Sequence, residues 1–345
     1  MRTNLESLLP PGTHAVAMPN WREPRFLMPD AGARQRWRLG ALYPAGRWQG
    51  KVLKALLRVW VAVGLGATRT SADASWEIGT FVDGAVPNAR TGVAWIGPPG
   101  PSQKATLELS DETGRVVAYV KYAETNLGRR RLQAERAALI ALPEGVGPSV
   151  LHYGPLLEGE ALCISPVQGH HVPSSANPPC GLVDVFESMR SGESLPASEH
   201  PWLRRIASNS SVDIAPWIAT LGGRDWDVVR MHGDLAPWNV LIADGGAVRL
   251  VDWEHASESG FPLVDMAYWV LQVGCLVRRS SPSRTFRKAV RHILALEGGS
   301  IGLVEAQSIV RLAALMAYEH ASEDGHGAAS RAQVWRRTVW ECDIA

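Results

Sequence analysis

The chain has 345 residues, a hydrophobic content of 46% and a formal net charge of +1. This length can bury two sizeable cores, and the near-neutral charge gives no argument for nucleic-acid binding. No apolar run is long enough to cross a bilayer, and the beginning of the chain lacks the pattern of a signal peptide. The four cysteines are too scattered for a zinc site or a disulfide framework, which favours a reduced, cytoplasmic compartment.

Residues 1–90 are basic and rich in tryptophan, and we expect them to form an N-terminal extension. Within it, 50–64 has the pattern of an amphipathic helix. We favour a helix that packs on the next domain with its basic face in water, over one that contacts an anionic membrane surface. A third hypothesis is an anionic substrate or partner recognised by Arg34, Arg36 and Arg38.

Three segments after residue 90 have the composition of antiparallel strands: 91–96, 105–109 and 115–122. The loop between the first two, 97–104, contains glycines, which would let backbone N–H groups approach a bound phosphate. The candidate phosphate contacts are Gly100, Ser102 and Lys104. Three prolines remove N–H donors from this loop, so a rigid surface loop is an equally good interpretation.

Lys121 lies near the end of the third strand and is the only lysine between Lys104 and Lys288. A compact ammonium suits phosphates better than a forked guanidinium does. The segment 129–142 predicts a helix whose only acid is Glu135; a nucleotide site of the kind named below would pair Lys121 with this acid. The alternatives are an exposed edge-strand lysine and a surface glutamate paired with a nearby arginine on the helix.

The second half of the chain reads mostly as helix after two more strands. The expected strands are 150–154 and 161–165. The expected helices are 182–190, 202–221 with an interruption at Pro216, 262–277, 284–296 and 302–320. The later helices carry both acids and arginines, so they do not choose between a cationic and a neutral substrate.

The most specific motif is His232-Gly233-Asp234, followed by Asn239 and, after a predicted hairpin, by Asp252. Val240-Leu241-Ile242 and Val248 to Val251 are its strands, and Asp244-Gly245-Gly246 is its turn. Such a hairpin returns the chain beside its start, so Asn239 and Asp252 can face one metal ion. The structural alternative is a turn with a side-chain cap and two surface carboxylates.

This motif resembles the catalytic and metal loops of the aminoglycoside phosphotransferase and choline kinase family, which shares the protein-kinase-like fold. His232-Gly233-Asp234 stands where protein kinases have His-Arg-Asp, and Asp252-Trp253-Glu254 where they have Asp-Phe-Gly. The segment from Gly260 to Ala267 is similar to the family's Gly-x-Pro-x-x-Asp-x-Ala. The resemblance implies an α+β fold with a small antiparallel-sheet N-lobe and a mainly helical C-lobe.

The resemblance also implies roles for individual residues. Asp234 would orient or deprotonate a substrate hydroxyl, and Asn239 and Asp252 would hold Mg²⁺. Lys121, held by Glu135, would contact the phosphates of ATP. His232 would buttress the catalytic loop rather than titrate in catalysis.

Three further expectations concern the organisation of the lobes. The hinge would be 165–169, where Ser165 and Val167 are candidates for bonding the adenine edge. Asp265 would tie the following helix to the catalytic loop. The expected domains are the extension 1–90, the nucleotide-binding N-lobe 91–168 and the catalytic, substrate-binding C-lobe 169–345.

The function implied is transfer of the γ-phosphoryl group of ATP to a hydroxyl of a small molecule, of sugar, aminoglycoside or aminoalcohol type. The partner would be this acceptor rather than a nucleic acid. A non-catalytic nucleotide-binding scaffold on the same fold is the alternative, and the weak phosphate loop favours it. A protein kinase fits less well, since the chain has no Ala-Pro-Glu after the metal loop.

Overall fold

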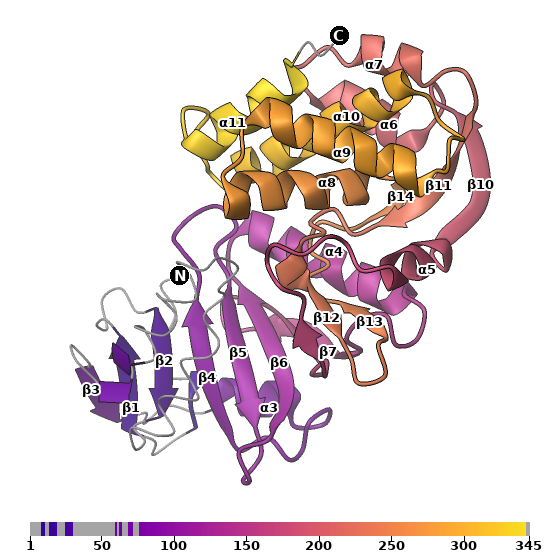
Figure 1. The fold of residues 1–345 in the computed structure, drawn as a ribbon. Coiled ribbons are helices and arrows are strands. Elements are labelled where there is room, and N and C mark those ends of the chain that lie inside the picture. The colour runs from indigo at the N-terminus through magenta and orange to yellow at the C-terminus, as the bar shows by residue number, and fades with distance from the viewer. Residues whose placement is uncertain are drawn as a thin grey trace. The chain divides into compact units, whose positions relative to one another are not determined.

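The computed structural model of the chain (Figure 1) describes residues 8–10, 14–18, 25–29, 59–60, 62–63, 68–71 and 76–342. Most of the expected helix at 50–64 lies outside these residues, as do Arg34, Arg36 and Arg38. The chain divides into two compact units, 1–140 with 148–167 and 141–147 with 168–345. The main boundary, between Val167 and Gln168, falls inside the segment predicted as the hinge.

The first unit contains an antiparallel sheet in the order β3-β1-β2-β4-β5-β6-β8-β7. Its strands are β1 (His14–Met18), β2 (Phe26–Pro29), β3 (Thr68–Ser71), β4 (Thr91–Ile96), β5 (Ala105–Ser110), β6 (Val116–Ala123), β7 (Val150–Leu156) and β8 (Gly159–Ile164). β2 pairs directly with β4 through Phe26–Trp95 and Leu27–Ala94. The described strands of the first ninety residues therefore extend the sheet of the first unit.

The helices α3 (Glu77–Val82) and α4 (Asn126–Ala141) belong to the same unit as this sheet. Thr125 caps α4, since its Oγ1 accepts a hydrogen bond of 3.1 Å from the Gly128 N–H. Buried aliphatic side chains of α3 and of the sheet form one core cluster, which includes Ile78, Leu107 and Val120. The predicted strands at 91–96, 105–109 and 115–122 and the helix that follows them are confirmed.

The second unit contains two three-stranded sheets, in the orders β10-β11-β14 and β13-β12-β9. Their strands are β9 (His170–His171), β10 (Arg190–Pro196), β11 (Asp225–Met231), β12 (Val240–Ile242), β13 (Val248–Leu250) and β14 (Ser257–Gly260). The segment 141–147 docks here, because the Leu250 N–H donates to the Val146 carbonyl over 2.7 Å.

Helices make up the rest of the second unit (Figure 1). They are α5 (Gly181–Glu187), α6 (Pro201–Asn209), α7 (Ala215–Thr220), the 3₁₀ turn η3 (Pro237–Asn239), α8 (Val264–Gln272), the π-turn η4 (Val273–Arg278), α9 (Pro282–Leu296), α10 (Leu303–Glu323) and α11 (Arg331–Trp340). None of the described helices has the length and apolar character needed to cross a bilayer. The predicted α+β fold, a small antiparallel-sheet unit followed by a mainly helical one, is confirmed.

Some details of the predicted helices were wrong. The helix expected over 182–190 ends at Glu187, because the chain then forms β10 and pairs with β11. Pro216 does not interrupt a long helix but lies in the first turn of α7, where a proline N–H is not needed. The strand β14 and the helix α11 were not predicted.

Candidate active site

The carboxylate of Asp234 is held at both of its oxygen atoms. The Tyr268 hydroxyl, from α8, donates to Oδ1 over 2.7 Å. The Asn239 amide Nδ2 donates to Oδ2 over 3.0 Å and to the Asp234 main-chain oxygen over 2.9 Å. One orientation of the carboxylate is therefore fixed before any ligand arrives.

Asp234 also has the electrostatic character of a general base. Burial raises the pKa of Asp234 to about 7, the Tyr268 hydrogen bond lowers it, and the negative charges of Asp252 and Glu254 raise it further. A base whose pKa lies near neutral pH combines the correct protonation state with a useful driving force for proton transfer. Three acidic side chains therefore act on one another at this loop.

The loop of residues 232–239, called the catalytic loop after its predicted role, has its backbone fixed by a glycine and a buried acid. Gly233 has φ 78°, and a Cβ there would lie 2.1 Å from the His255 carbonyl oxygen, so only glycine fits. Asp265 accepts hydrogen bonds from the His232 N–H over 2.6 Å and from the Gly233 N–H over 2.9 Å. The expected structural role of Asp265 is thus seen in its geometry.

His232 joins the catalytic loop to the strand that precedes Asp252. Its Nε2 lies 3.0 Å from the Val251 carbonyl oxygen, and its Nδ1 accepts from the Asp234 N–H over 3.2 Å. A carbonyl needs a donor and an N–H needs an acceptor, so the ring is neutral with its proton on Nε2. The buried ring also packs on Trp253, with 4.6 Å between centroids. It acts as the buttress expected from the sequence.

The predicted hairpin is present and returns the chain to Asn239. Val240 pairs with Leu250, and the Val251 N–H donates to the Asn239 main-chain oxygen over 3.0 Å. Asp252 follows with φ 68°, a left-handed conformation that Asp and Asn tolerate better than most residues. The hairpin therefore brings Asp252 beside Asn239, as expected.

Asn239 and Asp252 offer oxygen ligands of the type that Mg²⁺ prefers. The amide nitrogen of Asn239 is used by Asp234, which leaves the amide oxygen as the atom that could face a cation. Within the described parts of the chain, no group of three or more His, Cys, Asp or Glu side chains could hold a metal. A small ligand set fits Mg²⁺ at nucleotide sites, because phosphates and water supply its other ligands.

In the first unit, Lys121 and Glu135 form the ion pair predicted for them. Lys121 Nζ lies 2.6 Å and 2.8 Å from the two carboxylate oxygens of Glu135. Lys121 is 8% exposed and Glu135 is fully buried. β6 is an interior strand, paired with β5 and β8, so Lys121 is not an exposed edge-strand lysine.

The candidate phosphate loop is closed by its own backbone. The Gly97 N–H donates to the Lys104 carbonyl over 2.9 Å, and the Gln103 N–H donates to the Gly100 carbonyl over 3.2 Å. Gly100 is exposed at the tip, and Ser102 is half-buried. Two loop N–H groups are thus already used, and contact of Gly100 and Ser102 with phosphates stays a prediction.

The predicted hinge residues follow β8. The Ser165 N–H donates to the Ser149 carbonyl over 2.9 Å, and its hydroxyl oxygen accepts from the Ser149 N–H over 2.9 Å. In this conformation the Ser165 N–H therefore cannot serve the adenine edge. Val167 is half-buried beside the boundary of the units, and adenine binding by Val167 or by the main-chain carbonyl of Ser165 stays a prediction.

Tyr268 is the site residue that sequence reasoning missed. It lies three residues after Asp265 on α8, so both side chains project from one face of the helix toward the catalytic loop. It is also hydrogen-bonded to Gln272, and Arg336 of α11 acts on it electrostatically. That helical spacing was the available signal, and it required knowing that Asp265 faces the loop.

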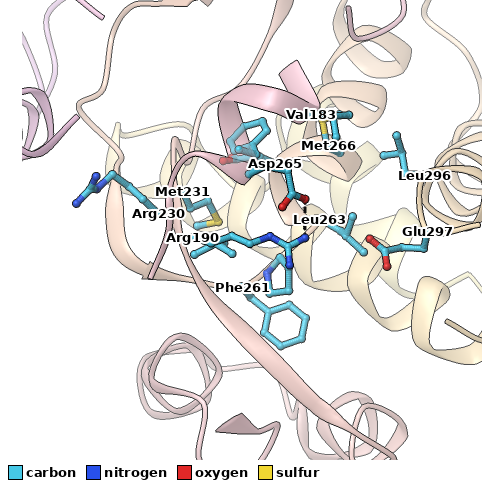
Figure 2. Close-up of a pocket in the computed structure, with 14 residues that line it drawn as sticks. Val183, Arg190, Arg230, Met231, Phe261, Leu263, Asp265, Met266, Leu296 and Glu297 are labelled. Carbon is cyan, nitrogen blue, oxygen red and sulfur yellow. Dashed lines mark hydrogen bonds and ion pairs between the residues drawn. The ribbon is translucent and has the colours of Figure 1, made fainter. Parts of the chain in front are cut away.

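A cavity of about 130 Å³ lies next to Asp265 in the second unit (Figure 2). Its walls are mainly apolar and include Met231, Phe261, Leu263 and Met266. Neither Asp234, Asn239 nor Asp252 lines it. The cavity therefore adjoins Asp265, which supports the catalytic loop, and is separate from the site of Asp234, Asn239 and Asp252.

No family model and no curated protein sequence matches the chain. The structure is similar to an ethanolamine kinase of Plasmodium vivax, with a TM-score of 0.48, 9% identity, and coverage of 90% of this chain and 94% of that one. It is also similar to a choline kinase of Cryptosporidium parvum Iowa II, with a TM-score of 0.44, 12% identity, and coverage of 74% and 88%. The functional argument therefore rests on the residues of the site.

Proposed function

We propose that the protein is an ATP-dependent phosphotransferase that moves the γ-phosphoryl group to a hydroxyl of a small molecule. The observation that carries the proposal is the carboxylate of Asp234. It has a pKa near neutral pH, it is oriented by Tyr268 and Asn239, and it adjoins the hairpin that presents Asp252. The structural alternative, a surface turn with a side-chain cap, would need neither a shifted pKa nor an oriented carboxylate.

In the proposed reaction, Asp234 accepts a hydrogen bond from the acceptor hydroxyl and takes its proton. The hydroxyl oxygen bonds to the γ-phosphorus as the bond from that phosphorus to the bridging oxygen breaks, and ADP leaves with the electron pair. Asp234 has a lone pair for this role even though Tyr268 and Asn239 each donate to it, because two carboxylate oxygens accept about four hydrogen bonds. Its contribution is proton acceptance together with alignment.

The remaining residues would hold the nucleotide. Asn239 and Asp252 would bind Mg²⁺, which neutralises phosphate charge when bound. The mutual effect of Asp234, Asp252 and Glu254 supports this assignment, because a divalent cation relieves repulsion among carboxylates. Lys121 would contact phosphate oxygens, with Glu135 holding its ammonium in place.

The test is nucleotide binding followed by an acceptor screen. We expect Mg–ATP to raise the Tm of the wild-type protein and one acceptor class to release ADP. Sugars, aminoglycosides, choline-like aminoalcohols and lipid-linked glycans make up the screen. Asp234→Asn keeps the shape of the side chain, so it should bind Mg–ATP and fail to transfer. Equal transfer by Asp234→Asn and the wild type would refute the assignment of the base.

A nucleotide-binding scaffold is the second candidate. The observation in its favour is the loop of residues 97–104, where two N–H groups bond within the loop and three prolines have no N–H to offer. Binding of Mg–ATP without transfer to any acceptor would favour this function. Against it stand Lys121, Asp234, Asn239 and Asp252, since a scaffold has no chemical need for all four.

A further inference from the structure

The helix α9 has two faces of opposite character. Thr285, Phe286, Ala289, Val290 and Ile293 are buried. The other face carries Arg284, Arg287, Lys288 and Arg291, of which the three arginines are exposed and the lysine is half-buried. These positions follow the i, i+3, i+4, i+7 spacing, so the four cations form a straight row of roughly 10 Å along the axis.

Two more cations precede this row, and no acid interrupts it. Arg278 and Arg279 are exposed at the end of η4. Between Asp265 and Glu297 the chain has no acidic residue, whereas the whole protein carries 35 Lys and Arg against 34 Asp and Glu. The basic face of α9, defined as Arg278, Arg279, Arg284, Arg287, Lys288 and Arg291, is therefore a local concentration of charge.

Arg278 and Lys288 contact neutral oxygen atoms. Arg278 Nη2 donates to the Ser175 carbonyl over 2.7 Å, and Lys288 Nζ donates to Asn177 Oδ1 over 3.2 Å. Burial lowers the pKa of Lys288, and the positive charges of Arg278 and Arg291 lower it further. The cations thus act on one another, so a surface of negative charge would stabilise the face.

The side chains of this face favour phosphate-bearing partners other than nucleic acid. Arginine predominates, and its planar group forms paired hydrogen bonds with phosphates. Single-stranded nucleic acid would need aromatic side chains for stacking, and Phe286 of α9 is buried. Nucleic-acid-binding domains also tend to have a pI above about 9, whereas the pI of this chain is 7.8.

We propose that the basic face of α9 is a docking surface for an anionic lipid bilayer. Four to eight Lys or Arg residues on an amphipathic helix form a pattern that binds acidic lipids; α9 carries four on its exposed side, and Arg278 and Arg279 lie just before it. The apolar side of α9 is taken up by the core, so adsorption is electrostatic and without insertion. This role does not depend on the proposed phosphotransfer, and it concerns a different element from residues 50–64.

The test is co-sedimentation of the full chain with vesicles of phosphatidylcholine alone or mixed with phosphatidylserine. We expect binding only to the mixed vesicles. The combined variant Arg284→Gln, Arg287→Gln and Arg291→Gln should lower the partition coefficient about tenfold or more at low salt. Rising salt should release the wild-type protein, because screening weakens exposed charges.

The matched control is the combined variant Arg115→Gln, Arg130→Gln and Arg204→Gln, which removes the same charge from exposed positions elsewhere. It should bind the mixed vesicles as the wild type does. An equal loss in both variants, or unchanged binding by the α9 variant, would overturn the proposal. Failure of the wild type to bind the mixed vesicles would also overturn it. That outcome includes the case in which α9 binds duplex DNA and not the vesicles.

Discussion

The hydroxyl of Tyr268 donates a hydrogen bond of 2.7 Å to Oδ1 of Asp234. The two residues are 34 positions apart in the sequence, and Tyr268 is almost fully buried. The bond therefore belongs to the tertiary structure, and it couples α8 to the orientation of the proposed base. It also lowers the pKa that burial raises.

Tyr268→Phe removes this donor and keeps the ring. We expect kcat to fall about tenfold with the nucleotide KM unchanged, because alignment is lost and phosphate binding is not. Without the donor the pKa of Asp234 rises, so the acidic limb of the kcat profile should move to higher pH. Steady-state kinetics across pH would show both effects. Tyr318→Phe, at a ring packed on Trp340, should change neither.

Asp252→Asn tests the metal assignment with little change to the backbone. Asparagine tolerates the left-handed conformation at φ 68°, whereas alanine there adds strain of about 1 kcal/mol. We expect transfer to fall by about 100-fold or more, because a ligand charge is lost, with Tm close to that of the wild type. Normal turnover by Asp252→Asn over a range of Mg²⁺ concentrations would contradict the assignment.

Gly233→Ala should unfold the catalytic loop. The new Cβ would lie 2.1 Å from the His255 carbonyl oxygen, at φ 78°. Gly192 has nearly the same φ, 80°, in open space, so Gly192→Ala costs only the backbone strain of about 1 kcal/mol. We expect urea unfolding to show that Gly233→Ala loses several kcal/mol more of unfolding free energy than Gly192→Ala does. Equal losses of unfolding free energy in Gly233→Ala and Gly192→Ala would show that the loop moves to accommodate the new Cβ without further destabilisation.

Asp265 predicts a pH dependence of stability. Burial raises the pKa of Asp265 from 3.8 to about 7. Between these values the folded protein holds a proton that the unfolded chain releases, so the contribution of this group to stability falls as pH rises. We expect the wild type to lose on the order of 2 kcal/mol more than Asp265→Asn between pH 4 and 7. Urea unfolding at several pH values measures this.

The control for that series is Asp244→Asn in the exposed hairpin turn. Its unfolding free energy should follow the wild type at every pH. Parallel pH curves for the wild type and Asp265→Asn would show that folding does not change the pKa of Asp265, and would contradict the prediction.

Replacing only one member of the Lys121–Glu135 pair should lower the unfolding free energy more than replacing both. Lys121→Met leaves the fully buried carboxylate of Glu135 without its ammonium partner, which costs about 3 kcal/mol or more. The double variant Lys121→Met with Glu135→Gln should regain much of that stability and still fail in transfer. Urea unfolding and an ADP-release assay, run on the same samples, separate the two effects. A double variant as unstable as the single one would contradict this account.

Local signals in the sequence predicted the hairpin and the strand that carries Lys121. The hairpin has an Asp-Gly-Gly turn between two short apolar runs, and β6 has β-branched and aromatic residues. The prediction that Asn239 and Asp252 lie close together in space then followed from the hairpin alone.

What could not be predicted depends on pairing between distant segments. The segment after Glu187 has no strong strand pattern and becomes β10 only because β11 offers it a partner. Tyr268 reaches Asp234 only because Asp265 fixes the start of α8 against the catalytic loop. The sequence shows the spacing of Asp265 and Tyr268, but neither the pairing of β10 with β11 nor the contact of Asp265 with the catalytic loop can be read from a local pattern.

The pairing of β2 with β4 sets a limit on how the protein can be shortened. A chain beginning at residue 91 would lose β2 and leave the outer edge of β4 without its partner. That edge belongs to the strand of Val93 and Trp95, and an uncovered apolar edge recruits strands from other molecules. The trimmed protein should therefore self-associate on expression, even with Asp234, Asn239 and Asp252 intact.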